Sequence, residues 1–287
     1  MSRTFNILAL IFSFLKLSCQ LPDTDLWLFR IESDKTKRSV LTSALNITNR
    51  IGYDNQPSFS PDNKKIYYVS VREDKQADIY YYDIKKKENV RVTKTSESEY
   101  SPSYTADGKF ITSVVVETDS AQRIHFINPI TGGHEKKLEP DSVGYYTFLN
   151  KDTVIFYKLT DPHSLRYFAT NSNYEYWLGN KPVRTFRALN RQTLLYGLKD
   201  SNTVTFYKYN FLIRKAEKYC EYSSLNEDVV WHATLGLIKS DTTKLMRYNE
   251  SKNDWELLYD LKSFGIKKIT RFAFDEKNKY LVVVNNL

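Results

Sequence analysis

Aromatic and basic side chains recur at intervals of roughly 40 to 50 residues along this chain, each near the start of a short apolar segment. Tyrosine and arginine suit molecular recognition, because both combine a large contact area with a polar end. The alternative is that each tyrosine packs between neighbouring structural units as part of the core. The candidate binding residues are Tyr53, Gln56, Tyr100, Tyr145, Arg184, His232 and Arg271.

Residues whose chemistry could make or break covalent bonds are few. The four histidines are His125, His134, His163 and His232, and none pairs with another at a spacing in the sequence that is typical of metal ligands. His125 lies inside a predicted strand, which favours a structural role for its ring. His232 follows Trp231 in a strand that would line a channel, and it is the one histidine that we retain as a site candidate.

The acidic residues also indicate structural roles and not catalysis. Asp62 and Asp107 occupy equivalent turns of a repeated hairpin, where aspartate commonly bonds nearby backbone amides. The sequence contains neither a calcium loop of the EF-hand kind nor a Gly-x-Ser-x-Gly nucleophile motif. We therefore expect no catalytic residue, no bound metal and no cofactor, and we favour a binding protein over an enzyme.

The chain contains an internal repeat. Residues 56–66, with the sequence Gln-Pro-Ser-Phe-Ser-Pro-Asp-Asn-Lys-Lys-Ile, align with residues 101–111, which lie 45 positions later. Residues 149–156 and 189–196 form a second pair with an offset of 40, and residues 274–281 repeat the outline of the first pair. Each copy consists of a short strand, a turn rich in Asp, Asn, Gly or Lys, and a second strand.

A third strand and a short fourth strand follow each hairpin, as in residues 78–83 and 90–93. The third strands alternate in polarity and begin near residues 25, 78, 123, 164, 203 and 243. Four antiparallel strands per roughly 40 residues are typical of a β-propeller blade. The sequence therefore predicts an all-β fold, namely a six-bladed β-propeller of four-stranded antiparallel blades.

The last blade is expected to be closed by N- and C-terminal strands. Residues 25–31 form a third strand with no partner strands before it, whereas residues 269–274 and 280–284 form a first and a second strand with none after them. Joining them in one blade would pair edges that are otherwise exposed. The distance in sequence between the third strands near residues 25 and 78 is longer than the others, and we assign the extra residues to the loop 46–55. We expect the candidate binding residues in the loops that enter each blade, around one mouth of the channel.

Residues 57–68, followed by residues 78–83 and 90–93, resemble the WD40-like (PD40) repeat of TolB-like β-propellers. Residues 102–109 and the entry strand at residues 23–31 are similar to the same family. The resemblance implies the propeller fold. It carries less information about function, because propellers host unrelated activities. It also implies an α/β domain ahead of the propeller, for which the segment before the first strand is too short, so that a role in the Tol system is in doubt.

Residues 1–19 are predicted to be a signal peptide and residues 20–287 the propeller. Arg3 supplies the basic start, and the apolar run after it is too short to span a bilayer. Cys19 makes a lipoprotein anchor an alternative, although Lys16 stands where such a signal needs an aliphatic residue. We expect a periplasmic or secreted protein with no transmembrane segment.

The formal charge of +8 falls to +6 without the predicted signal, and the basic residues are scattered among acidic ones. Such a distribution is typical of a solvated surface, so we do not expect nucleic acid as a partner. The leading hypothesis is an exported, monomeric, non-catalytic scaffold that binds a protein, peptide or glycan of the envelope or the medium at the channel mouth. The alternative is a propeller enzyme of the lyase or lactone hydrolase type, with a metal-assisted site in the central channel.

Overall fold

The computed structural model describes residues 21–105, 107–223 and 229–287. Within these ranges the chain forms 24 β-strands and one short 3-10 turn, η1 (Lys262–Phe264). No helix in the described part is long and apolar enough to cross a membrane. The predicted signal peptide, including Cys19, lies outside the described residues.

Five groups of four strands pair antiparallel in sequence order, as the repeat predicts. The first group is β3 (Tyr53–Phe59), β4 (Lys65–Val71), β5 (Ala77–Asp83) and β6 (Glu88–Arg91). The second is β7 (Ser98–Tyr104), β8 (Ile111–Val116), β9 (Gln122–Ile127) and β10 (His134–Lys137). The third is β11 (Val143–Asn150), β12 (Thr153–Lys158), β13 (Ser164–Ala169) and β14 (Tyr174–Asn180). The fourth is β15 (Pro182–Asn190), β16 (Thr193–Asp200), β17 (Thr203–Asn210) and β18 (Lys215–Ser223). The fifth is β19 (Val229–His232), β20 (Gly236–Asp241), β21 (Lys244–Asn249) and β22 (Asp254–Asp260).

The remaining four strands come from both ends of the described chain. They are β1 (Thr24–Ser33), β2 (Ser39–Asn46), β23 (Ile269–Phe274) and β24 (Tyr280–Asn286). They pair antiparallel in the order β23-β24-β1-β2, with Trp27 opposite Val283 in the contact between the two ends. A single parallel pairing of Thr24 with Tyr53 joins this group to β3.

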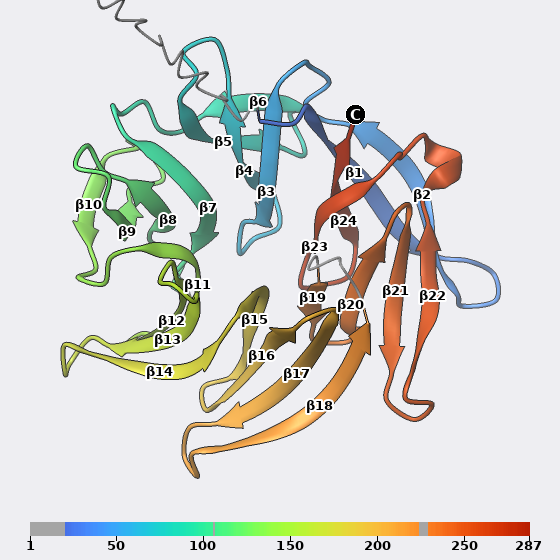
Figure 1. Cartoon of the computed structure of the whole chain (residues 1–287). Helices are drawn as coiled ribbons and strands as arrows, with labels where there is room; N and C mark the ends of the chain where they lie inside the picture. The colour runs from blue at the N-terminus through green and yellow to red at the C-terminus, as the bar shows by residue number, and fades with distance from the viewer. Residues whose placement is uncertain (1–20, 106, 224–228) are drawn as a thin grey trace, which may run out of the picture.

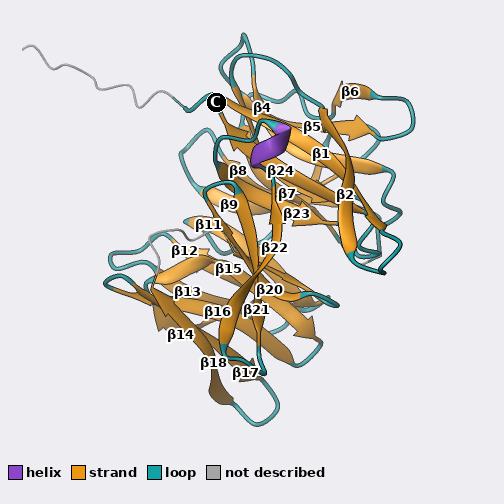
Figure 2. Ribbon diagram, turned by 90° about the vertical axis from the view of Figure 1, so that its right-hand side faces the viewer, coloured by secondary structure: helices purple, strands orange, loops and turns teal. Residues whose placement is uncertain are grey.

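The sheets surround a common centre, as Figure 1 shows. Strands β3, β7, β11, β15, β19 and β23 lie nearest the centre, and β6, β10, β14, β18, β22 and β2 lie on the outside. In the view turned by 90°, strands make up the body of the molecule and the 3-10 turn lies at its surface (Figure 2). The six inner strands therefore surround a shared centre.

The hydrophobic core consists of the interfaces between neighbouring sheets. Leu26 of β1 and Val282 of β24 pack with Ile66 of β4, so the sheet that combines both ends contacts the first group. Tyr67, also on β4, packs with Ile111 of β8 in the second group. A strand between two sheets is covered on both faces, which explains why five of the seven residues of β4 are buried. Each apolar strand thus stabilises two interfaces.

The segment between β2 and β3 differs from the expectation of a long loop. Strands β1 and β2, of 10 and 8 residues, form a hairpin. Much of the extra length between the third strands near residues 25 and 78 therefore lies in these two strands. Arg50 in the short connection that remains donates to the Asp54 carboxylate at 3.0 Å and to the carbonyl of Val71 at 2.7 Å. Asp54 is fully buried, so this ion pair holds the connection against the first group of strands.

Candidate functional site

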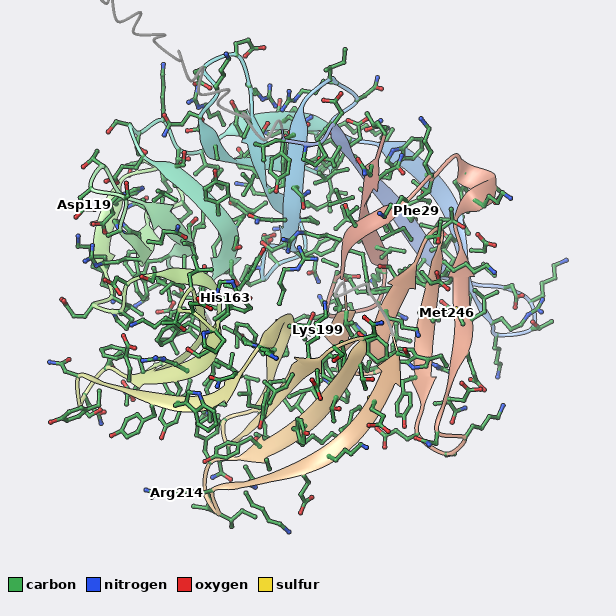
Figure 3. The ribbon with its side chains drawn as sticks, in the orientation of Figure 1. Phe29, Asp119, His163, Lys199, Arg214 and Met246 are labelled. Atoms are coloured by element: carbon green, nitrogen blue, oxygen red, sulfur yellow. The ribbon has the colours of Figure 1, made fainter. Side chains whose placement is uncertain are left out.

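A cavity of about 1260 Å³ lies where the inner strands meet. Six of the seven candidate binding residues line it: Tyr53, Gln56, Tyr100, Tyr145, Arg184 and Arg271. They belong to β3, β7, β11, β15 and β23, so each inner strand except β19 contributes at least one of them. Side chains of these strands extend into the space between the sheets (Figure 3).

The position of these residues within the elements differs from the sequence expectation. We predicted them in the loops that enter each blade, but the structure places them in the inner strands themselves. Strand β3 begins at Tyr53 and not after Gln56, because its pairing with β4 extends to the partners Tyr53 and Val71. A side chain on a paired strand has a more fixed direction than one on a loop, which suits a preformed binding cavity.

The seventh candidate, His232, lies elsewhere. It ends β19 and is 6% exposed, and it lines neither of the two cavities described here. Its Nε2 atom lies 3.1 Å from the carbonyl oxygen of Asp275, and its Nδ1 atom lies 3.0 Å from the hydroxyl of Thr234. Both ring nitrogens are therefore engaged in holding adjacent turns, and we leave His232 out of the proposed site.

Two arginines dominate the electrostatics of the cavity. Arg271 donates a hydrogen bond to the Tyr145 hydroxyl at 3.0 Å. Burial raises the pKa of the Tyr145 phenol, but the guanidinium groups of Arg271 and Arg184 lower it by more, so this pKa lies below its ordinary value. Lys268 adds a third cation to the lining, against one carboxylate, that of Asp241. The cavity is therefore cationic.

The tyrosines of the cavity differ in their protonation chemistry. Burial raises the pKa of Tyr53 to about 12, and the partly opposing effect of Arg271 does not reverse the shift. The Tyr53 hydroxyl is therefore a neutral group at neutral pH and can donate or accept a hydrogen bond. Tyr145, in contrast, already accepts from Arg271 and favours negative charge more than an ordinary tyrosine does.

A second cavity of about 260 Å³ shares Gln56, Arg184 and Arg271 with the first. Its wall includes two irregular backbone positions, at Gln56 in β3 and Ser101 in β7, where φ is +56° and +54°. Each lies at a shift in strand register next to a proline, and the Oε1 atom of Gln56 accepts a hydrogen bond from the Ser101 amide at 2.6 Å. Positive φ is unfavourable for residues other than glycine, and such positions cluster at functional sites.

The lining residues of the two cavities are mostly of the types that hold a ligand by hydrogen bonds and stacking. Around the two cavities, the described residues include Asp241 as the sole carboxylate and neither histidine nor cysteine. Cys220 is buried in the core between the fourth and fifth groups of strands, and burial raises the pKa of its thiol to about 12. Arginine and tyrosine can hold a carboxylate and stack on a ring or a peptide plane.

A different cluster, in the second group of strands, is not predicted from the sequence. Glu97, His125 and His134 have potential metal-binding atoms within 4.8 Å of one another. The two histidines are nine positions apart in the sequence, a spacing that matches no familiar metal motif. They meet because β9 and β10 form an antiparallel hairpin, which brings their side chains together across the two strands. A hairpin with one histidine on each strand is the signal that could have identified them.

No protein-family model matches the sequence, and no curated protein matches it significantly. Among solved structures, an oligogalacturonate lyase in complex with manganese shares 13% identity, with a TM-score of 0.55 over 90% of this chain and 82% of that one. A protein assigned as TolB from Agrobacterium tumefaciens shares 11% identity, with a TM-score of 0.64 over 93% of this chain and 99% of that one. A chain of a nidogen/laminin complex shares 11% identity, with a TM-score of 0.57 over 91% of this chain and 98% of that one.

These likenesses establish the fold. The chain is an all-β protein of four-stranded antiparallel sheets, with the fold of TolB-like β-propellers, as the repeat predicted. At this level of identity the neighbours do not identify the function, because the fold occurs both in a lyase and in a chain of a nidogen/laminin complex.

Proposed function

We propose that this chain is an exported, non-catalytic binding protein, built as a six-bladed propeller whose last blade combines strands from both ends. The five consecutive groups of four strands and the group β23-β24-β1-β2 support this count. The predicted signal peptide supports export, to the periplasm or the medium, with a lipid anchor at Cys19 as the alternative. We further propose that it acts as a monomer.

The observation that carries the proposal is the pair Arg184 and Arg271 in a central cavity that contains one carboxylate. Guanidinium groups bind carboxylates through two parallel hydrogen bonds, and such bonds are stronger than neutral ones. Tyr53 and Tyr100 add flat surfaces at the same cavity. The partner is therefore a protein, peptide or glycan that presents an acidic segment to the channel mouth.

The experiment compares acidic and neutral probes by calorimetry on the purified chain. The probes are oligogalacturonate, polyglutamate and a neutral oligosaccharide of similar length. We expect at least one acidic probe to bind and the neutral one not to bind. The double variant Arg184→Met/Arg271→Met should weaken binding at least ~10-fold, since two charged hydrogen-bonding groups are lost.

The matched control is Lys277→Met, which removes one positive charge from the exposed turn between β23 and β24. This variant should bind as the unmodified chain does. Binding of the neutral probe with equal affinity, or equal loss of binding in Lys277→Met and in the double variant, would contradict a specific cationic site. Failure of both acidic probes would contradict the proposed class of partner.

A second candidate function is an enzyme that acts on an acidic sugar in the same cavity. Its support is the Tyr145 phenol, whose pKa the two arginines lower, together with the likeness to an oligogalacturonate lyase. A metal-assisted site fits less well, because the lining offers only Asp241 as an anionic ligand and no histidine among the described residues. Release of unsaturated products from oligogalacturonate, abolished by Tyr145→Phe, would favour the enzyme over the binding protein.

A further inference from the structure

Two histidines and a glutamate converge at the second group of strands, away from the central cavity. His125 lies on β9 and His134 on β10, while Glu97 lies in the connection between β6 and β7. The two Nδ1 atoms are 3.2 Å apart, and the Oε2 atom of Glu97 is 3.5 Å from the Nδ1 atom of His134. Three possible ligand atoms from three segments of the chain therefore lie close together.

Two of the three separations match those between ligands of one small metal ion, and the third is no longer than 4.8 Å. In a tetrahedral zinc site with bonds of roughly 2.0–2.1 Å, any two ligand atoms lie roughly 3.3 Å apart. The two distances measured here, 3.2 Å and 3.5 Å, lie on either side of that value. Two imidazole nitrogens and a carboxylate oxygen are also a donor set that zinc prefers.

The other nitrogen of each ring lies near a carboxylate. His125 Nε2 lies 2.8 Å from Glu117 Oε1, and His134 Nε2 lies 3.3 Å from Glu99 Oε1. Histidines that bind metals commonly direct their second nitrogen to a carboxylate, which sets the tautomer and makes the ligand more basic. The Glu117 carboxylate favours a proton on His125 Nε2, so that His125 Nδ1 presents a lone pair toward the Nδ1 atom of His134 at 3.2 Å. The same tautomer of His134 places its Nε2 proton beside Glu99 and lets both Nδ1 atoms bind one ion.

The surrounding charges favour a cation in this position. Glu117 is held by Arg123 at 2.7 Å and by Lys137 at 3.0 Å, which fixes the carboxylate that supports His125. Glu99 is fully buried and accepts hydrogen bonds from Thr93 and Thr95. With Glu97, three carboxylates therefore adjoin the two rings, and two basic side chains balance one of these carboxylates.

We propose that this cluster binds one zinc ion, through the Nδ1 atoms of His125 and His134 and the carboxylate of Glu97. The side chains of His134 and Glu97 are 17% and 21% exposed, so a water molecule can reach the fourth position. The ion would join the segment before β7 to the β9–β10 hairpin and so stabilise the second group of strands. This inference is independent of binding in the central cavity.

The test is zinc binding by the full chain after chelator treatment and removal of the chelator. Calorimetry with zinc chloride should show one site per chain, and thermal melting should show a higher Tm with zinc than without it. Cobalt(II) in place of zinc should give the intense visible absorption of a tetrahedral site. Absence of a stoichiometric site, or a cobalt spectrum typical of six oxygen ligands, would overturn the proposal.

Variants locate the site. His134→Ala should abolish the zinc-dependent rise in Tm, and Glu117→Gln should weaken zinc binding by ~10–100-fold, because it changes the carboxylate behind His125. The control is His163→Ala, which removes an exposed histidine, labelled in Figure 3, from the connection before β13. Zinc binding that survives in His134→Ala, or that is lost equally in His163→Ala, would show that the ion binds elsewhere. Glu117→Gln gives the comparison if His134→Ala fails to fold.

Discussion

At the scale of single residues, Asp78 on β5 shows how burial and pairing compete. Its side chain is 1% exposed and lies 2.6 Å from the guanidinium group of Arg91, which also contacts Asp74 at 2.9 Å. Burial raises the pKa of Asp78 to about 6, because the attraction of Arg91 only partly offsets the loss of solvation. The carboxylate is therefore less stable in the folded chain than in the unfolded one.

This shift predicts a dependence of stability on pH. The pKa of Asp78 is about 6 in the folded chain, and its ordinary value is 3.8. The contribution of Asp78 to the stability of the fold is therefore fully present below pH 3.8 and is lost as the pH rises through 6. Two pKa units correspond to about 3 kcal/mol in the free energy of unfolding. The variant Asp78→Asn lacks this titration, and its stability relative to the unmodified chain should increase by about that amount between pH 4 and pH 7.

Urea denaturation followed by tryptophan fluorescence at several pH values measures this difference. The control is Asp119→Asn, which changes a carboxylate on the exposed turn between β8 and β9, labelled in Figure 3. Parallel pH profiles for Asp78→Asn and the unmodified chain would contradict the assigned role of Asp78.

At the scale of elements, two glycines with similar backbone angles differ in how closely other atoms pack against them. Gly132, in the turn between β9 and β10, has φ +72°, and Gly236, at the start of β20, has φ +76°. A Cβ atom at Gly132 would lie 2.0 Å from the backbone oxygen of Val92, whereas one at Gly236 would meet no atom within 4 Å. The β9–β10 turn therefore packs directly against the chain that follows β6.

We predict different losses of stability for alanine at these two positions. Gly236→Ala should cost about 1 kcal/mol, the ordinary penalty for a left-handed backbone at alanine. Gly132→Ala should cost several times more, because the backbone of another segment must move. Chemical denaturation of both variants provides the measurement, and equal losses would show that the turn and the Val92 backbone are not in close contact.

At the scale of the whole molecule, the sheet β23-β24-β1-β2 joins segments that are far apart in the sequence. Strand β1 pairs with β24 from Thr24 opposite Asn286 to Arg30 opposite Tyr280. Its apolar residues also form one cluster with β4 and another with β21. Loss of β24 would therefore expose an edge strand and open two interfaces between sheets.

Deletion of residues 280–287, which removes β24, should make the chain aggregate or melt without cooperativity. Deletion of Leu287 alone, a residue that is 50% exposed, is the control and should leave a soluble protein. Thermal melting and size-exclusion chromatography of both proteins make the comparison. A soluble, cooperatively melting protein without residues 280–287 would contradict the proposed closure.

Much of the strand pattern could be predicted, because its signals are local. The third strands expected near residues 78, 164 and 203 begin at residues 77, 164 and 203. Alternating polarity and turns that contain Asp or Asn involve residues that are neighbours in the sequence, so they can be recognised without the tertiary structure. Strand β2 was missed, because all eight of its residues are exposed or half-buried and its apolar signal is weak.

The sequence by itself determined the repeat, the all-β class and six cavity residues that lie at related positions of successive repeats. Only the tertiary structure decided that His232 lies outside that cavity, that Arg184 and Arg271 act together on Tyr145, and that His125 faces His134. The physical reason is distance along the chain. Arg271 and Tyr145 are 126 residues apart, and their contact depends on how whole sheets pack around the centre, which no local pattern encodes.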